Sequence, residues 1–452
     1  MLPEFPLVEE FPYCCPVSVF AAIPQQGALF LDSARVDENG RYSFIGVSPF
    51  EIMLCKNATV NPFDALEQKL KQYPLSCLPD LPPFQGGVAG MFGYELGGYL
   101  EKIPQSTIDD LQLPELLVGF YDLVLAWDNK QKRAWVFSSG YPEQESAKRR
   151  ERAEQRISWV LGYLSQPLAQ IPNFAIDDSE ITSTFNQQSY EAAVSKVIEY
   201  IRAGDIFEAN ISQRFSCPRP QVDPFALYRK LRAKNPAPFA AYLQYNDWVV
   251  ASASPERFLK LSDGYVEARP IKGTRPRSQD PLIDKANGEA LLKSEKDWAE
   301  NVMIVDLMRN DISRVCKPNT IHVPQLCGLE SFATVHHLVS VVEGQLQENK
   351  TAIDLLKATF PGGSITGAPK IRTMEIIAEI EPTVRGPYCG SMGYIGFNGD
   401  MDLSITIRTF VMNKEKLTFQ TGGAVTVDSD PSEEYEETLT KAKALRKTLV
   451  EL

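Results

Sequence analysis

The spacing of apolar residues predicts both helices and strands in this chain. In the segment Ser189–Asp205, Val194 and Val197 recur at helical spacing and share one face. We therefore predict an amphipathic helix that begins at Ser189 and stops at Gly204. Other segments are rich in β-branched and aromatic residues and predict strands; they include FAAYLQYNDWVVASAS, GYVEARPIKG and KLTFQTGGAVTV.

The strand segments are joined by hairpin-like turns such as Asn398-Gly399-Asp400, which favour antiparallel pairing. This predicts an α+β fold of layered antiparallel β-sheets flanked by helices, rather than a doubly wound parallel sheet. The stretch 165–188 lacks sustained periodicity and contains two prolines, so we place a boundary there. It separates an N-terminal region, 1–165, from a C-terminal domain, 185–452.

Two further helices are predicted to begin with acidic residues. In KSEKDWAENVMIVDLMRND, Ser294 can cap the helix and Asp297 can complete a capping box. In DPSEEYEETLTKAKALRK, Asp430 is placed to cap and Pro431 occupies the first turn. Both segments therefore predict well-defined helix starts.

Each acidic helix carries a pair of acids three residues apart, Asp297 with Glu300 and Glu434 with Glu437. Acids near helix starts often do no more than complement the helix dipole, by about 0.3–1 kcal/mol each. If the two helices converge, however, four carboxylates require a cation, and Mg²⁺ suits such a set of oxygen ligands. The sequence alone leaves both interpretations open.

Composition and charge narrow the classes of function. A net charge of −12 and a pI near 5.0 disfavour a general nucleic-acid binder. The apolar segment Leu116–Trp127 is too short to span a membrane, and the N-terminus has no basic leader. The eight cysteines show no metal spacing and are expected to be reduced. We expect a cytoplasmic protein that binds neither nucleic acid nor membrane.

Several motifs contain candidate catalytic groups. SASPERF places Glu256 after a strand, where it can act as a general acid or pair with Arg257 at the surface. Adjacent residues His336 and His337 point to opposite faces of a strand, so at most one is expected to face a site. The glycine-rich FPGGSITGAPK does not match a phosphate-binding loop, because Ala-Pro-Lys follows its second glycine where Lys-Ser/Thr is required.

The segment EARPIKGTRPR places Lys272 among three arginines, which is electrostatically unfavourable for a lysine. Taken together with AENVMIVDLMRND, GGSITGAPKIRTMEII, GPYCGSMGYIG, SITIRTF and QTGGAVTVDSDPSEEYEET, it resembles the chorismate-utilising enzymes in order and spacing. The resemblance is dense from Ser189 to Leu452 and looser before it. It implies that residues 185–452 are a chorismate-binding catalytic domain and that 1–165 resembles the N-terminal region of anthranilate synthase large subunits.

The lysine distinguishes two branches of this family. The anthranilate-forming branch typically reads PIAGTRPRG here, whereas the branch that forms 4-amino-4-deoxychorismate, on the path to 4-aminobenzoate and folate, reads PIKGTRPR as this chain does. The resemblance implies that Lys272 attacks C2 of chorismate while the C4 hydroxyl leaves, and that ammonia then adds at C4. Since only a neutral amine is a nucleophile, we expect the neighbouring arginines to lower the pKa of Lys272.

The resemblance also implies roles for other residues. Glu256 would protonate the departing hydroxyl, and His337 would lie close to the ring. Mg²⁺ would be held by Glu300 and Glu437, with Asp297 and Glu434 in support. The remaining implied contacts are to the substrate and comprise Thr274, Tyr394, Arg408, Gly422, Gly423 and Ala424.

Two binding partners besides chorismate are implied. Segments in both halves of the chain resemble a tryptophan pocket of this family, made here of Ser33, Arg41, Tyr42, Ser43, Phe44, Pro238, Phe239 and Ala240. Cys389 lies in a β-rich stretch rather than on a nucleophile elbow, so ammonia is expected from a separate glutamine amidotransferase subunit.

One position departs from the family pattern. Glu208 stands where many amine-transferring relatives have glutamine and where water-using isochorismate enzymes have lysine, so its role stays open. Two alternatives to C4 amination also remain: an anthranilate synthase large subunit, disfavoured by Lys272, and a non-catalytic ligand-binding subunit.

Overall fold

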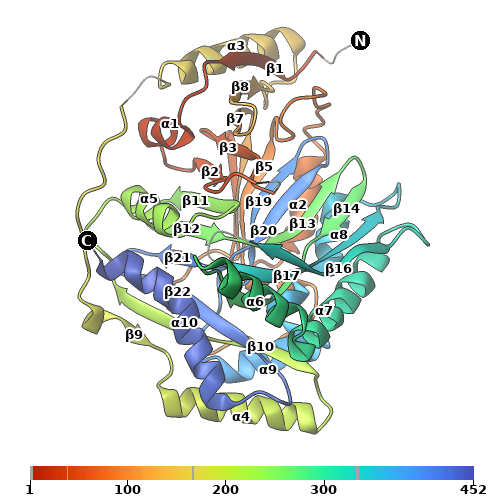
Figure 1. Ribbon diagram of the computed structural model, residues 1–452. Helices are drawn as coiled ribbons and strands as arrows, with labels where there is room; N and C mark the ends of the chain where they lie inside the picture. Colours follow the sequence, from red (N-terminus) through yellow and green to blue (C-terminus); the bar gives the residue numbers. More distant parts are fainter. Residues whose placement is uncertain (1–3, 38, 165–166, 332–334, 452) are drawn as a thin grey trace.

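The computed structural model describes residues 4–37, 39–164, 167–331 and 335–451, and it shows two large antiparallel sheets flanked by helices (Figure 1). This architecture confirms the predicted α+β class. The first sheet has, in order, β1 (Leu7–Phe11), β8 (Arg133–Ser138), β7 (Leu123–Asp128), β3 (Tyr42–Gly46), β2 (Leu29–Asp32), β11 (Phe239–Tyr245), β12 (Trp248–Ser254), β21 (Thr409–Met412), β22 (Lys416–Val425), β10 (Glu208–Pro218) and β18 (Gly367–Ala368), with β9 (Thr182–Ser183) beside β10.

The second sheet lies across the first and contains the remaining described strands. Its order is β15 (Ile271–Pro276), β17 (Val335–Gln345), β14 (Tyr265–Ala268), β13 (Arg257–Ser262), β20 (Met401–Ile405), β19 (Ser391–Gly396), β5 (Gly87–Phe92), β6 (Leu116–Tyr121) and β4 (Glu51–Cys55), with β16 (His322–Ser331) beside β17. The α-helices are α1 (Pro16–Ala22), α2 (Pro62–Leu70), α3 (Ser146–Leu161), α4 (Gln187–Arg202), α5 (Pro224–Lys234), α6 (Pro281–Leu292), α7 (Glu295–Ser313), α8 (Ala352–Thr359), α9 (Lys370–Ile380) and α10 (Pro431–Val450). Short 3₁₀ turns are η1 (Tyr94–Tyr99), η2 (Asp178–Glu180) and η3 (Gly363–Ile365).

Both sheets take strands from both halves of the sequence. In the first sheet β2, from the N-terminal region, pairs with β11, and in the second β5 pairs with β19. The predicted boundary at 165–188, of which 165 and 166 lie outside the described residues, is thus a connection between halves that share the same two sheets. A buried cluster from both sheets, including Phe44, Phe84, Trp135, Val250 and Met392, forms the core between them.

Helix starts follow the predicted capping chemistry with local changes. Ser294 accepts a hydrogen bond from the backbone N–H of Asp297 and begins α7. Asp430 caps α10 by accepting from two backbone N–H groups. The helix predicted from Ser189 begins earlier, at Gln187, because Asn186 caps it and Ser189 returns the capping-box bond. The capping side chain is therefore Asn186, rather than Ser189, which lies closer to the apolar residues of the helix.

A β-bulge lies in β15 between Lys272 and Thr274, where its register against β17 shifts. The residue inside the bulge is Gly273, with φ at +71°. This backbone conformation is unfavourable for residues that have a side chain, but glycine adopts it readily. The glycine that follows the lysine in the sequence thus permits a local kink at the edge of the second sheet. Helices α6 and α7 pack against β15 and β17, and α10 packs against β22 (Figure 1).

Within the described residues, no helix combines the length and apolarity needed to cross a bilayer.

Candidate active site

Lys272 lies in the interior, with only 8% of its surface exposed. Its Nζ atom donates a hydrogen bond to Glu208 Oε1 at 2.5 Å, and Glu208 is fully buried at the start of β10. Since β15 is the edge strand of the second sheet and β10 belongs to the first, this buried ion pair bridges the two sheets. It marks the point where their edges meet.

The arginines beside Lys272 in the sequence do not surround its amine, so the predicted lowering of its pKa by these cations is wrong. Each guanidinium is neutralised by another acid: Arg269 donates to Glu330 at 2.6 Å, Arg275 to Asp297 at 3.2 Å and Arg277 to Asp284 at 2.7 Å. Residues adjacent along a bulged edge strand point in different directions, and proximity in sequence therefore misled the electrostatic argument.

Carboxylates dominate the surroundings of Lys272 instead. Burial alone would lower the pKa of Lys272, but the charges of Glu208, Glu300 and Glu256 outweigh it and raise the pKa above its ordinary value. Burial also raises the pKa of Glu300 to about 7, and the nearby Lys272 limits that rise. The resting site therefore contains an ammonium group that must lose a proton before it can act as a nucleophile.

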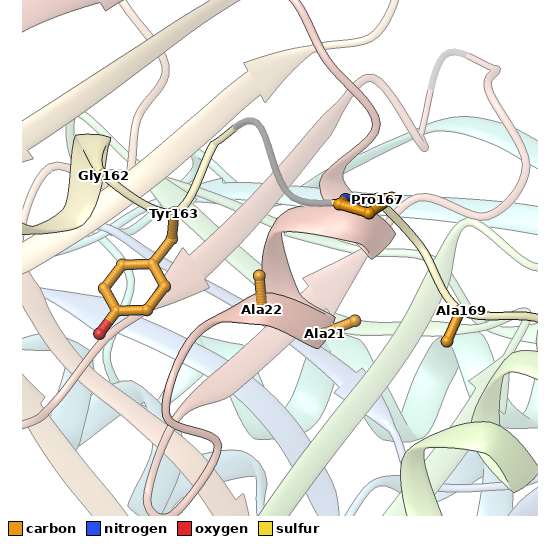
Figure 2. Close-up of a pocket in the computed structure, with 6 residues that line it drawn as sticks. All are labelled: Ala21, Ala22, Gly162, Tyr163, Pro167 and Ala169. Carbon is orange, nitrogen blue, oxygen red and sulfur yellow. The ribbon is translucent and has the colours of Figure 1, made fainter.

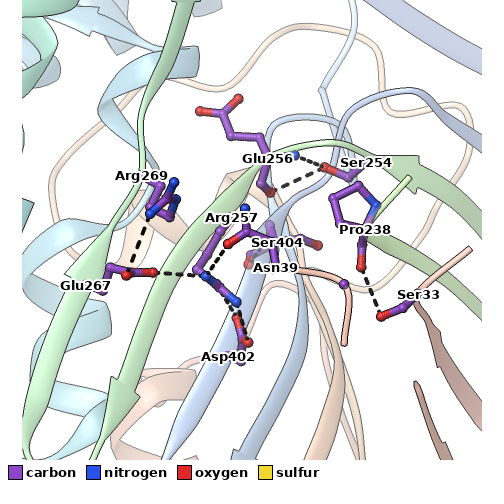
Figure 3. Close-up of polar contacts among 12 residues, drawn as sticks. Ser33, Asn39, Pro238, Ser254, Glu256, Arg257, Glu267, Arg269, Asp402 and Ser404 are labelled. Atoms are coloured by element: carbon purple, nitrogen blue, oxygen red, sulfur yellow. Dashed lines mark hydrogen bonds and ion pairs between the residues drawn. The ribbon is translucent and has the colours of Figure 1, made fainter. Parts of the chain in front are cut away.

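Glu256 is separated from the neighbouring ion pairs. Its Oε1 accepts a hydrogen bond from Ser364 Oγ at 2.7 Å, while Arg257 pairs with Asp402 at 3.0 Å, which excludes a Glu256–Arg257 surface pair. Figure 3 shows the two side chains pointing apart. Burial raises the pKa of Glu256 to about 7 despite the hydrogen bond from Ser364. A carboxyl group that remains partly protonated near neutral pH can donate a proton to a leaving group.

The two adjacent histidines face different partners, as their places on one strand predict. His336 lies 3.1 Å from Asp284 on α6. His337 Nδ1 lies 3.1 Å from the carbonyl oxygen of Gly273 and 3.0 Å from Thr274 Oγ1. Because a carbonyl can only accept, Nδ1 carries the proton and Nε2 is left as an acceptor. Burial lowers the pKa of His337 to about 4, so it is neutral.

The starts of the two acidic helices approach each other at Lys296. Lys296 on α7 lies 3.7 Å from Glu434 of α10, and the charges of Glu434, Glu300, Glu437 and Asp297 together raise its pKa against the effect of burial. Glu434 Oε2 is buried without a hydrogen-bond partner among the described residues. Lys296 thus feels the charge of all four carboxylates, while Lys441 and Arg275 pair with Glu437 and Asp297.

These carboxylates fit an oxygen-binding cation only in part. Within the described ranges, no three metal-ligating side chains are already gathered into a ligand set. Glu437 is half-exposed and accepts a bond from Lys441 at 2.6 Å, and Asp297 is engaged by Arg275. The unpartnered oxygen of Glu434 and the crowding of acids suit Mg²⁺, provided that Lys296 and Lys441 give way.

The predicted substrate-binding strand lies beside this cluster. A Cβ atom at Gly423 would be 2.8 Å from Glu434 Oε2, and Lys441 Nζ donates to the carbonyl oxygen of Gly422 at 2.9 Å. Arg408 Nη1 donates to the carbonyl of Lys441 at 2.9 Å, which brings this arginine to the same region. Ala424 continues β22 and pairs with Asn210 of β10.

Tyr394 lies elsewhere. Its ring stacks on Phe84 at 4.5 Å and meets Phe44 edge-on in the core between the sheets. The tyrosine close enough to interact electrostatically with Arg408 is Tyr388. A substrate contact by Tyr394 therefore stays a prediction that its location does not favour.

The segments assigned to a tryptophan pocket do come together. Ser33 Oγ donates to the carbonyl oxygen of Pro238 (Figure 3) and to that of Tyr42, and the Ser33 N–H donates to Ser43 Oγ. Arg41 pairs with Asp128 across the first sheet. Tryptophan binding there stays a prediction.

Sequence reasoning missed three polar groups of this region. Ser364 was present in the glycine-rich GGSITGAPK motif but received no role. Asn210 is two residues from Glu208 on the same face of β10, so strand alternation could have found it. The side-chain oxygens Asn210 Oδ1 and Thr406 Oγ1 are buried without hydrogen-bond partners among the described residues. Thr406 carries no signal in the sequence alone.

A separate hollow of about 360 Å³ lies on the outside of the first sheet between α1 and the end of α3 (Figure 2). It is lined by Ala21, Ala22, Gly162, Tyr163, Pro167 and Ala169. This lining contains no charged side chain, so the hollow offers no candidate catalytic group.

Comparison with known proteins defines the class. The model of the chorismate binding enzyme family matches residues 28–447, and the chain belongs to this family. It is similar to anthranilate synthase component 1 of Thermus thermophilus, with 40% identity over 96% of this chain and 95% of that protein. It is equally similar to aminodeoxychorismate synthase component 1 of Salmonella typhimurium, with 40% identity over 85% and 82%. The crystal structure of anthranilate synthase component I from Streptococcus pneumoniae matches with a TM-score of 0.81, 31% identity and coverage of 96% and 98%. The chain is thus a chorismate-acting enzyme.

The buried environment of Glu256 generates a first prediction. In ¹³C NMR of protein with labelled glutamate carboxyls, the signal that is absent from Glu256→Gln should titrate near pH 7. Removing the Ser364 hydroxyl in Ser364→Ala should move this pKa upward, because that hydrogen bond favours the carboxylate.

Protonation favours the folded state, so the contribution of Glu256 to stability is fully present below its ordinary pKa of 4.5 and is lost as pH rises through about 7. Titration of this signal below pH 5 would contradict the assignment.

Proposed function

We propose that this enzyme aminates chorismate with ammonia to give 4-amino-4-deoxychorismate, through a covalent bond to Lys272, in 4-aminobenzoate and folate biosynthesis. The observation that supports it is the buried amine of Lys272 at the meeting point of the two sheets, with a protonatable carboxyl, Glu256, close enough to feel its charge. Lysine is well suited to covalent catalysis when it is neutral.

In the first step the neutral Lys272 nitrogen forms a bond to C2 of the ring. Both conjugated ring double bonds shift toward C4, the C4–O bond breaks, and the departing oxygen takes the proton of Glu256 and leaves as water. In the second step ammonia forms a bond to C4, the double bonds return and the C2–N bond breaks. The new ammonium group returns a proton to Glu256. The sum is chorismate plus ammonia giving the 4-amino product plus water.

The substrate's carboxylates would be held by groups on facing elements. Arg408 supplies a guanidinium suited to a bidentate grip, and the backbone of Gly422–Ala424 supplies N–H groups at a strand without side chains in the way. His337, which is neutral, and Thr274 lie close to Lys272 along the edge of the second sheet. These contacts would orient C2 toward the amine.

Mg²⁺ would be held by Glu300 and Glu437, with Asp297 and Glu434 in support. When bound, it would neutralise the ring carboxylate and reduce the charge change as the hydroxyl departs. The crowding of these acids around Lys296 supports the site. Cation binding would also remove part of the negative charge that raises the pKa of Lys272.

Ammonia is proposed to come from a separate glutamine amidotransferase subunit. The relatives are named as component 1, which implies a further component. Cys389 is buried, and burial raises the pKa of its thiol to about 12, which does not suit an amidotransferase nucleophile.

The second candidate function is anthranilate synthesis, favoured by the equal identity to an anthranilate synthase component 1. It would use direct attack of ammonia at C2 followed by loss of pyruvate. A buried lysine at position 272, where the anthranilate-forming branch typically has alanine, favours the covalent route.

Product analysis with chorismate, Mg²⁺ and excess ammonium tests the proposal. The wild-type enzyme should form the 4-amino compound without releasing pyruvate. Lys272→Ala should lower that yield on the order of 10³-fold, because the nucleophile is lost. Loss of the ion pair with Glu208 should cost about 3 kcal/mol of stability, so the variant is assayed where circular dichroism shows it folded. Anthranilate and pyruvate from the wild type, or an unchanged 4-amino yield from the variant, would contradict the proposal.

Metal binding tests the carboxylate cluster. Electron paramagnetic resonance with Mn²⁺ as a substitute for Mg²⁺ should show metal binding, and Glu300→Gln should weaken its affinity at least about tenfold. Loss of a residue that only supports a metal ligand already lowers affinity by about that factor, and loss of a direct ligand should lower it at least as much. Glu436→Gln removes the same charge from an exposed position on α10 and should change the affinity less than twofold. Equal effects of both substitutions would mean that only general charge is involved.

A further inference from the structure

We infer that Glu208 is the base that takes the proton from Lys272 before the amine attacks. This role rests on the proposed function and adds the step that the function leaves unassigned. Lys272 carries a proton in the resting structure, since carboxylates surround it, and an ammonium group has no lone pair with which to form a bond. Some group must therefore receive that proton within the site.

Distance selects Glu208 among the carboxylates that act on Lys272. Its Oε1 is 2.5 Å from Nζ, so a hydrogen bond already connects the donor to the acceptor. Glu256 is engaged by Ser364 and is needed in its protonated form, while Glu300 acts on Lys272 by its charge without a hydrogen bond to Nζ among the described residues. Among the described residues, Glu208 is the carboxylate at hydrogen-bond distance from Nζ.

The backbone fixes Glu208 for this role. It pairs with Ala368 of β18 at the end of the first sheet, and Thr373 Oγ1 donates to its carbonyl oxygen at 3.3 Å. The side chain is completely buried, and its second oxygen, Oε2, has no hydrogen-bond partner among the described residues. Among the described residues, Lys272 is therefore the one group that donates a hydrogen bond to this carboxylate.

Burial makes the proton transfer feasible. A buried ion pair with few other hydrogen bonds is only marginally favoured over a neutral pair, because desolvation penalises both charges. Moving one proton along the existing hydrogen bond turns ammonium and carboxylate into amine and carboxylic acid, without any charge leaving the site. Binding of substrate, which displaces water, would strengthen this preference.

The proton is returned at the end of the cycle. Glu208 is protonated when the amine attacks C2 and remains so while Glu256 serves the leaving oxygen. When ammonia displaces the lysine nitrogen, Lys272 leaves as a neutral amine and recovers its proton from Glu208. The resting ion pair is restored, and the reaction needs no proton from solvent.

The test is the rate at which the covalent adduct forms. Protein is mixed with saturating chorismate and Mg²⁺ without ammonium, quenched after milliseconds to minutes, and analysed by intact mass. Glu208→Gln keeps the shape and a hydrogen-bond acceptor but cannot take a proton. Its rate constant should fall about 10²-fold, the lower range for general acid–base catalysis, while the half-saturating chorismate concentration stays within threefold. Glu208→Asp keeps a displaced carboxylate and should react at an intermediate rate.

Asp311→Asn is the matched control, because Asp311 forms another buried pair, with Lys370, at the same distance of 2.5 Å. It should lower the melting temperature but leave the adduct rate within twofold. If Glu208 merely holds the ammonium, its removal would ease deprotonation, and Glu208→Gln would react as fast as wild type or faster. That result would overturn the role of Glu208 while leaving the proposed function intact. The same conclusion would follow if Glu208→Asp formed the adduct no faster than Glu208→Gln. Absence of any adduct in the wild type would overturn the proposed function as well.

Discussion

The buried ion pair between Lys272 and Glu208 is the interaction on which the site depends. It connects an edge strand of one sheet to a strand near the edge of the other, so the relative placement of the two sheets determines whether the amine and the carboxylate meet. A buried pair of this kind is costly to assemble and contributes little net stability compared with apolar packing. Its presence at the junction of the sheets is better explained by chemistry than by stability.

Several local features serve this pair. The bulge at Gly273 kinks β15 at the residue after the lysine, and the arginines of the same segment are neutralised by partners of their own. The negative charge around the amine is balanced by other cations, chiefly Lys296 among the acids of α7 and α10. The site is therefore a network of near-balanced charges, in which substrate and metal can change which groups hold protons.

Much of this arrangement was predictable from sequence, and the failures have physical reasons. Periodicity and turn residues predicted the α+β class, and the acids at the starts of α7 and α10 come close enough to act together on Lys296, without forming a ready metal-ligand set among the described residues. The pKa argument for Lys272 failed because neighbours along a bulged strand are not neighbours in space. Long-range contacts, such as Glu208 with Lys272 or Ser364 with Glu256, join residues 64 and 108 positions apart, which no local pattern can pair.

The central claim is that Lys272 presents its nitrogen to the ring of chorismate. It is tested most directly by a crystal structure of the Glu256→Gln variant with chorismate and Mg²⁺, in which the leaving group cannot be protonated and the complex before reaction accumulates. The account predicts Lys272 Nζ about 3–3.5 Å from C2, in line for attack. A nitrogen that points away from the ring, or a ring bound with C2 out of reach, would contradict it.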